Sequence, residues 1–368
     1  MKIIMTIPLF EAYPALEKHL PWMLLGNWPT PVQKLSNLGK AVGHQNLWIK
    51  RDDLSSDLYG GNKVRKLEFM LADARRKGFK WAITYGGIGT NHGLATTAHA
   101  SRLGIRTALI LVKQPLTGHV QENLLLDRHF GAEIHYAPST AAGVLQSAGV
   151  YLRRLRVYFI PPGGSSTLGS LGYVNAALEL KKQVEAGLLP EPEHIFCALG
   201  SKGTLAGLML GARLAGMKTR VTGVQVAEKW ITKNENIVRL ANRMVALLRK
   251  YDNSVPPLKF TLDDVNVNHD FFGGLYGRVT EQGRQAVELM QKTEGIRLEQ
   301  VYTAKTMAAL LDFIARNPGL NSTPMLYWHT YNGADLSRVL EANHDYTALP
   351  RELHWCFAEK LAPCLEDK

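Results

Sequence analysis

The sequence has few cysteines and no long apolar run. Its 368 residues include only three cysteines, Cys197, Cys356 and Cys364, and no CxxC pair. A disulfide framework and a zinc site are therefore not expected, and a reducing cytoplasm is the default location. No stretch approaches the roughly 18 uninterrupted apolar residues that a membrane-spanning helix needs. The start of the chain, with a short apolar run broken by Pro8, makes a poor signal peptide.

Clustered positive charge is also scarce, although the chain as a whole is basic. There are 43 Lys and Arg residues against 32 Asp and Glu residues, which gives a formal net charge of +11. These basic residues are scattered, and the densest run, at 153–156, is brief. We therefore favour an ordinary basic surface over a nucleic-acid-binding one. With 46% hydrophobic residues the composition is that of a globular protein, and the length allows two domains.

Strand-like and helix-like segments alternate in two regions. In the first, residues 81–85 predict a strand, residues 90–104 a helix with Thr90 as its N-cap, and residues 105–112 a strand covered on both faces. In the second, the strand 194–199 leads through GSKGT into a helix. Such winding predicts an α/β fold of two lobes, each a mostly parallel sheet flanked by helices, with a ligand cleft between them.

A stretch rich in Gly, Pro and Ser separates the two regions. It is PPGGSSTLGSLGY, residues 161–173, and its composition predicts a loop at which the chain crosses between domains. We expect a larger, cofactor-binding domain of residues 1–65 and 175–368, and a smaller domain of residues 66–174.

Lys63 lies where the glycine-rich stretch DLYGGNKVRKLE, residues 57–68, opens into a helix. Apolar residues spaced along one helix face indicate that the helix begins near Asn62 or Lys63. The positive end of the helix dipole disfavours the ammonium form of a lysine at this position, and a partly desolvated amine is a better nucleophile. Such amines bind carbonyl compounds covalently, and pyridoxal phosphate is the commonest of these cofactors. The alternative is that Lys63 and Lys66 are solvated first-turn charges.

Two further glycine-rich loops each join a strand to a helix. In GSKGT, residues 200–204, converging N–H groups favour a phosphate, but the spacing is not that of an ATP-binding loop. GGIGTNHG, residues 86–93, approximates a dinucleotide fingerprint, but His92 stands where its third glycine belongs. The other interpretation is an anion pocket in which Thr90, Asn91 and His92 present N–H groups to a substrate carboxylate. Binding of the dinucleotide NADP stays open as the weaker interpretation.

Taken together, nine stretches resemble one family of enzymes. They span residues 28–332 in the order PTPVQKLSNLG, LWIKRDDL, YGGNKVRKLE, GGIGTNHG, PPGGSSTLGSLGYVNAALEL, GSKGTLAGL, LYGRVTEQG, VYTAKT and YWHT. The family is that of the pyridoxal-phosphate enzymes related to D-cysteine desulfhydrase and 1-aminocyclopropane-1-carboxylate deaminase, which have the fold of the tryptophan synthase β subunit (fold type II). The resemblance implies a pyridoxal 5'-phosphate cofactor, a small amino-acid substrate and a homodimer.

The resemblance also implies a role for each matching residue. Lys63 would bind the cofactor and move the α-proton, and Asn91 would bond the ring hydroxyl. Thr90, Asn91 and His92 would bind the substrate carboxylate. Tyr302 would lie near the ring, and Tyr276 would face the substrate. The phosphate would be held by Gly200, Ser201, Lys202, Gly203 and Thr204.

Two positions bear on the choice of activity. The deaminases carry an acid that pairs with the pyridine nitrogen where this chain has Thr303, and a leucine where it has Thr330. Hydroxyl side chains at these two positions resemble the pattern of the desulfhydrases. A neutral partner for the pyridine nitrogen suffices when a good leaving group such as a thiolate departs. We therefore expect α,β-elimination, with D-cysteine favoured. The deaminase, a β-replacement enzyme and an NADP-dependent oxidoreductase remain alternatives.

Four positions depart from the family pattern. Thr90 replaces a serine, Lys202 adds a charge to the phosphate loop, and Tyr331 with Asn332 replaces a pair of glycines. A threonine keeps the hydroxyl but crowds the pocket with a methyl group. These departures leave the predicted cofactor unchanged and bear on the substrate.

Overall fold

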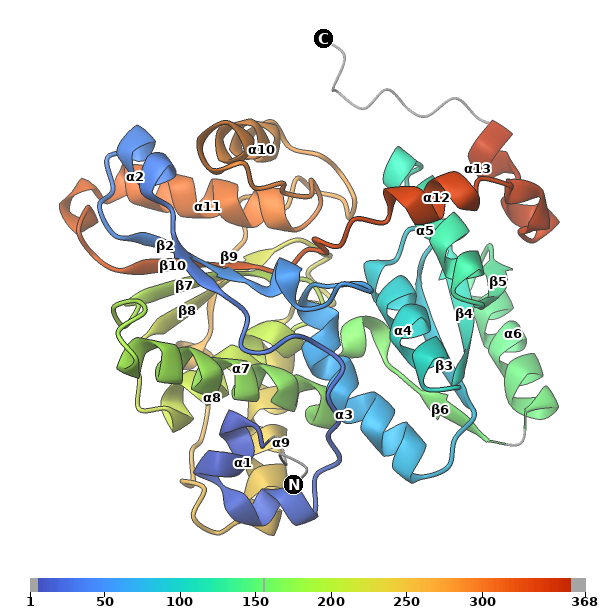
Figure 1. Ribbon diagram of the computed structural model, residues 1–368, viewed down its shortest axis with the longest axis horizontal. Coiled ribbons are helices and arrows are strands. Elements are labelled where there is room, and N and C mark those ends of the chain that lie inside the picture. The colour runs from blue at the N-terminus through green and yellow to red at the C-terminus, as the bar shows by residue number, and fades with distance from the viewer. Residues whose placement is uncertain (1–5, 155, 359–368) are drawn as a thin grey trace.

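Two sheets flanked by helices form a larger and a smaller lobe in the computed structural model (Figure 1). The structure describes residues 6–154 and 156–358, so Cys364 lies outside it. Within these ranges no helix is both long and apolar enough to span a bilayer. The predicted α/β class with mostly parallel sheets is confirmed, since one strand pair alone among those described, β1 with β2, is antiparallel.

The larger lobe is built on six strands in the order β1-β2-β10-β7-β8-β9. Its strands are Val32–Lys34, Leu47–Arg51, Met325–His329, His194–Leu199, Arg220–Gln225 and Asn266–Asn268, in that order. One face packs on α2, α10 and α11, which are Ser36–Val42, Glu281–Glu294 and Thr303–Arg316. The other packs on α1, α7, α8 and α9, which are Pro8–Ala12, Thr167–Glu185, Gly203–Leu214 and Asn234–Tyr251.

The smaller lobe is built on four parallel strands in the order β5-β4-β3-β6. In the same order they are Glu133–Ala137, Arg106–Val112, Trp81–Gly87 and Val157–Phe159. Its helices α4, α5 and α6 are Asn91–Arg102, Gly118–His129 and Thr140–Arg153. Helix α3, Asn62–Arg76, packs on α4 of this lobe and on α7 of the larger one, so it joins the two.

The end of the described chain returns to the smaller lobe. Helix α12, Ser337–Ala342, contacts α5, and α13, Trp355–Ala358, lies beyond it (Figure 1). Leu349 and Leu353 join the buried cluster that contains Leu109 of β4. The division into domains of residues 1–65 with 175–368 and 66–174 stays a proposal, and we amend it so that residues 337–358 go with the smaller lobe.

Local sequence rules account for most helix starts. Helix α4 is capped by Thr90, whose Oγ1 accepts a hydrogen bond from the N–H of Gly93, as predicted. The loop predicted over residues 161–173 is wrong in its second half, because α7 begins at Thr167 with Ser166 as its cap. Gly172 is needed for packing, since a Cβ there would lie 2.1 Å from the carbonyl oxygen of Arg65 in α3. This glycine therefore serves close helix packing.

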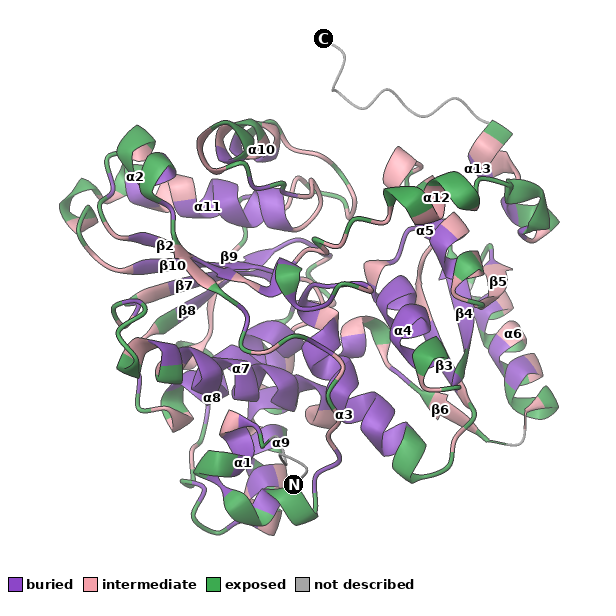
Figure 2. Ribbon diagram, in the orientation of Figure 1, coloured by how far each residue is buried: buried purple, intermediate pink, exposed green. Residues whose placement is uncertain are grey.

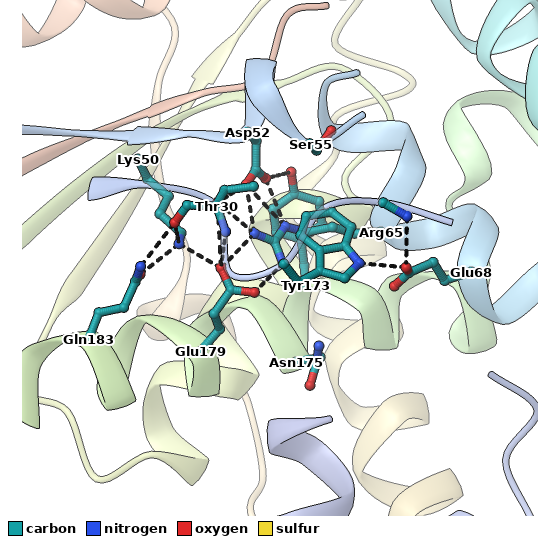
Figure 3. Close-up of polar contacts among 12 residues, drawn as sticks. Thr30, Lys50, Asp52, Ser55, Arg65, Glu68, Tyr173, Asn175, Glu179 and Gln183 are labelled. Carbon is teal, nitrogen blue, oxygen red and sulfur yellow. Dashed lines mark hydrogen bonds and ion pairs between the residues drawn. The ribbon is translucent and has the colours of Figure 1, made fainter. Parts of the chain in front are cut away.

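The cores lie between the sheets and their helices, and exposed residues lie on the outer helix faces (Figure 2). One polar cluster interrupts this pattern deep in the larger lobe, at its contact with α3 (Figure 3). Arg65 of α3 is its centre. The guanidinium donates to both carboxylate oxygens of Asp52, at 2.7–3.1 Å, and to both of Glu179, at 3.0 Å.

The remaining bonds of this ion cluster tie four elements together. Lys50 of β2 donates to Glu179 at 2.6 Å, while Tyr173 of α7 and Trp328 of β10 donate to Asp52 at 2.8 and 2.7 Å. Burial alone would raise the pKa of Asp52, but the charge and hydrogen bonds of Arg65 hold it below its ordinary value. Arg65 and Lys50 likewise hold the pKa of Glu179 below its ordinary value against the effect of burial, while burial lowers the pKa of Lys50. The cluster fixes α3 against β2, β10 and α7.

Glu68, one turn further along α3, holds the segment 22–28. Its carboxylate accepts hydrogen bonds from the indole N–H groups of Trp22 and Trp28 and from the main-chain N–H groups of Leu25 and Gly26. No lysine or arginine forms an ion pair with it among the described residues. Burial raises its pKa to about 7, although the hydrogen bonds oppose the shift.

Replacing Glu179 by Ala should cost about 3–5 kcal/mol of unfolding free energy, because it leaves Arg65 and Lys50 buried with one carboxylate between them. Glu185→Ala, at an exposed position of the same helix, is the matched control and should change stability by less than about 0.5 kcal/mol. Urea unfolding of both variants measures the difference. A loss below about 1 kcal/mol for Glu179→Ala would contradict the role of the ion cluster.

The Glu68→Gln variant should change how stability depends on pH. Between the ordinary carboxyl pKa of 4.5 and about 7 the folded chain keeps the Glu68 proton while the unfolded chain loses it, so Glu68 lowers stability as pH rises. The unfolding free energy of the unsubstituted protein minus that of the variant should therefore fall by roughly 3 kcal/mol from pH 4.5 to 7.5. Urea unfolding at several pH values checks this, and a difference independent of pH would refute it.

Candidate active site

A cavity of about 250 Å³ lies between the lobes, at the carboxyl ends of strands from both sheets. Segments that follow β3, β7, β8 and β10 line it, together with the first turns of α3 and α11. This is where open parallel sheets bind ligands. All the predicted site residues except Gly203 line it, namely Lys63, Thr90, Asn91, His92, Gly200, Ser201, Lys202, Thr204, Tyr276, Tyr302, Thr303 and Thr330.

Lys63 is in the first turn of α3, as predicted. Gly61, at φ +86°, is the N-cap, and a Cβ there would lie 2.7 Å from the carbonyl oxygen of Thr330. That close approach brings the chain after β10 against the start of α3. The Nζ of Lys63 donates to Oδ1 of Asn62 at 2.7 Å. Burial lowers the pKa of Lys63 from 10.5 to about 8, and the charge of Glu299 opposes the shift.

The loop at residues 200–204 lies next to this lysine in space. Nδ2 of Asn62 donates to Oγ1 of Thr204 at 3.2 Å, a bond that spans 142 residues of sequence. Lys202 has φ +63°, in the left-handed region that non-glycine residues seldom adopt. The N–H of Gly203 is bonded to Oγ of Ser165 at 3.1 Å. Gly200, Ser201, Lys202 and Thr204 line the cavity at the N-terminus of α8, an arrangement that suits a phosphate.

The sequence leaves open that Lys66 is a solvated charge in the first turn of the helix. The structure instead buries this residue completely. Its Nζ donates to the carbonyl oxygen of Gly163 at 3.0 Å and to Oγ of Ser165 at 3.3 Å, and no carboxylate pairs with it in the described chain. A Cβ on Gly203 would lie 3.0 Å from this Nζ. Burial, with the charges of Lys63 and Lys202, lowers the pKa of Lys66 well below its ordinary value. A phosphate beside this buried amine would favour its charged form, so the position of Lys66 next to the glycine loop fits a phosphate. Lys66 is three residues, about one helical turn, after Lys63, and this spacing could have indicated that both lysines belong to the site.

The start of α4 forms another wall of the cavity. Oδ1 of Asn91 accepts hydrogen bonds from the hydroxyl of Tyr59 at 3.0 Å and from Nδ2 of Asn123 at 3.1 Å, and it lies 2.8 Å from Nε2 of His119. Nε2 of His92 lies 3.1 Å from Oγ1 of Thr84, while its Nδ1 has no partner in the described residues. Burial, with the charges of two nearby lysines, lowers the pKa of His92, so this imidazole is neutral.

Two tyrosines form a hydrogen-bonded pair. The hydroxyl oxygens of Tyr276 and Tyr302 are 2.5 Å apart, and their rings meet edge to face. A Cβ on Gly200 would lie 3.3 Å from the Tyr302 ring, so this ring borders the glycine loop. Burial raises the pKa of Tyr276 to about 12 and that of Tyr302 well above its ordinary value. Both phenols therefore keep their protons near neutral pH.

The hydroxyl of Thr303 is already engaged at the start of α11. It donates to the carbonyl oxygen of Glu299 at 3.0 Å and accepts from the N–H of Glu299 at 2.7 Å. The Glu299 carboxylate accepts from the N–H groups of Val301 and Tyr302, and burial raises its pKa to about 7. No motif of the sequence singles out Glu299. The hydroxyl of Thr330 makes no hydrogen bond within the described residues, so it faces the cavity unengaged.

Comparisons with known proteins agree on one family. A family model described as "Pyridoxal-phosphate dependent enzyme" matches residues 23–327. D-cysteine desulfhydrase of Yersinia enterocolitica is 36% identical over 83% of this chain and 92% of its own length. That of Serratia proteamaculans is 34% identical over 82% and 90%.

Solved structures give the same fold. The structure titled "ACC deaminase homologue" has a TM-score of 0.73 at 31% identity and covers 92% of this chain and 99% of its own. The fungal L-serine ammonia-lyase from Rhizomucor miehei has a TM-score of 0.59 at 16% identity, covers 86% and 98%, and so bears on the fold alone.

The lowered pKa of Lys63 should appear in its reactivity. An amine reacts as the free base, so acetylation of Lys63 should rise about tenfold per pH unit and level off above pH 8, whereas an ordinary exposed lysine keeps rising to about pH 10.4. The measurement is trace acetylation between pH 6 and 11 with peptide mass spectrometry, after hydroxylamine has released any bound aldehyde. A Lys63 profile that parallels the exposed lysines would contradict the burial argument.

Proposed function

Because the chain belongs to the pyridoxal-phosphate dependent enzyme family, we propose that it removes the β-substituent of a small amino acid, with D-cysteine as the favoured substrate. The products would be pyruvate, ammonia and sulfide, with one water molecule consumed. The observation that carries this proposal is the buried amine of Lys63, which faces the loop of residues 200–204 across one cavity with a pKa of about 8. The curated relatives named D-cysteine desulfhydrase support the choice of substrate.

Pyridoxal phosphate, when bound, supplies an electron sink for the bonds at the amino acid's α-carbon. The residues that would hold it fit the group in charge and in shape. The N–H groups of the glycine loop, Lys202 and the hydroxyls of Ser201 and Thr204 would hold the phosphate. Lys66, whose pKa burial lowers well below its ordinary value, would be protonated beside the phosphate and would neutralise part of its charge.

Lys63 would carry the cofactor and then act as the base. Its amine is half deprotonated at a pH of about 8, so the free base is available at Nζ under mildly alkaline conditions. The N-terminus of α4, with Thr90, Asn91 and His92, would hold the substrate carboxylate. The neutral His92 adds no positive charge to attract the carboxylate, so the helix N–H groups and the threonine hydroxyl would do the binding.

The partners of the cofactor ring would be neutral hydroxyls. Thr303 is engaged with Glu299 in both directions, and Thr330 has its hydroxyl unengaged, so we assign the contact with the ring nitrogen first to Thr330 and then to Thr303. Without a carboxylate on that nitrogen the sink is weaker, which suits a thiolate leaving group. Tyr276 and Tyr302 keep their phenol protons, and one of them would donate a hydrogen bond to the departing sulfur.

A second candidate is 1-aminocyclopropane-1-carboxylate deaminase. The solved structure titled as a homologue of that enzyme, at 31% identity, supports it. The lack of an acid at position 303 favours elimination instead, because opening an unactivated cyclopropane needs the stronger sink. We also propose a homodimer and a cytoplasmic location, on the basis of the family resemblance and the low cysteine content.

Keto-acid release from D-cysteine, L-cysteine, β-chloroalanine and 1-aminocyclopropane-1-carboxylate tests this proposal. We expect turnover of D-cysteine and β-chloroalanine, and loss of at least about 100-fold in Lys63→Ala, because the base is removed. Lys80→Ala, at an exposed lysine just after α3, is the control and should keep full activity. Turnover of the cyclopropane substrate alone would favour the deaminase, and no turnover of any of the four would sink the elimination proposal.

A further inference from the structure

Tyr331 is the second residue after the end of β10, and it lines the cavity that contains Lys63. The backbone around it is held on both sides. The carbonyl oxygen of Thr330 accepts from the N–H of Asn62 at 3.1 Å, and Oδ1 of Asn332 accepts from the N–H of Gly60 at 2.7 Å. These two bonds hold the segment 330–332 against the start of α3.

The ring of Tyr331 reaches from the larger lobe to the smaller one. Its centroid lies 6.1 Å from that of His119, near the start of α5, with the ring planes at 61°. Nε2 of His119 in turn lies 2.8 Å from Oδ1 of Asn91, at the start of α4. Burial lowers the pKa of His119 to about 4, and burial raises that of Tyr331 to about 12, so the contact joins two neutral rings edge to face.

This ring wall, as we call Tyr331 with His119, stands next to the residues proposed to hold the substrate carboxylate. The cavity of about 250 Å³ is below the usual range of about 300–1,000 Å³ for ligand sites, yet it must take a cofactor and a substrate. A phenol fixed at this position removes room that a smaller side chain would leave. Little space then remains for a substrate side chain beyond its β-substituent.

We propose that the ring wall is the specificity determinant of this enzyme and restricts it to amino acids with a short β-substituent. The inference rests on the proposed function, since it concerns the amino acid bound in the same site. Tyr331 limits size by the space that its ring fills, and the amine that acts as the base belongs to Lys63.

Binding of unreactive amino acids to the holoenzyme tests the size limit without turnover. Alanine and phenylalanine lack a β-leaving group, and dissociation constants for each enantiomer can be measured from the change in the cofactor's visible absorbance. We expect the unsubstituted enzyme to bind alanine at least about 10-fold more tightly than phenylalanine. Tyr331→Ala and Tyr331→Gly should lower this ratio by about 10-fold or more, because removing the ring opens the cavity.

Two control variants keep the result specific. Tyr331→Phe retains the ring and should keep the ratio within about twofold of the unsubstituted enzyme, since the size limit is steric. Tyr151→Ala removes an exposed tyrosine of α6 and should leave the ratio unchanged. An unchanged ratio in both Tyr331→Ala and Tyr331→Gly, with alanine still bound, would overturn the size limit alone. Failure of the unsubstituted holoenzyme to bind either enantiomer of alanine would overturn the proposed function as well.

Discussion

The buried ion pairs of Arg65 with Asp52 and Glu179 fix the position of the helix that carries Lys63. Arg65 is two residues after Lys63 on α3, and its partners come from the end of β2 and from α7, so the amine is placed by charges that lie behind it. Taking four charges out of water is costly, and the structure compensates with closely fitted hydrogen bonds from Tyr173 and Trp328. A rigid α3 then presents one lysine, Lys63, to the cavity, and a second, Lys66, to the glycine loop.

Electrostatics inside the cavity follow from burial. The described lining has two lysines, Lys63 and Lys202, with Lys66 next to it, and two partly buried acids, Glu299 and Glu228. Three amines near the loop suit a doubly charged phosphate, and burial, with the charges of Lys63 and Lys66, keeps His92 neutral. The tyrosines keep their protons for the opposite reason, since a phenolate would be costly to bury. The site therefore combines a free amine, an anion pocket and proton-bearing phenols, which is the set that an elimination reaction needs.

Much of this could be predicted from sequence, since it depends on local rules. The cap at Thr90, the strand 194–199 and the helix start near Lys63 all follow from short-range patterns, and the order of the glycine-rich loops indicated the family. The buried position of Lys66 depends on tertiary packing, since its partners Gly163 and Ser165 lie 97 and 99 positions away. The start of α7 and the bonds of Glu299 to Val301 and Tyr302 are local, but the glycine-rich composition and the lack of a motif obscured them. The ring wall needs His119 beside Tyr331, about 200 positions away in sequence.

The central claim is that the amine of Lys63 binds the aldehyde of pyridoxal phosphate while the loop of residues 200–204 holds the phosphate. Borohydride reduction of the purified holoenzyme, followed by peptide mass spectrometry, tests this claim most directly because it makes the bond permanent and reports its position. The account predicts a phosphopyridoxyl group on the peptide that contains Lys63, at that residue. The same group on Lys66 or on a lysine outside the cavity, or no modified lysine at all, would contradict it.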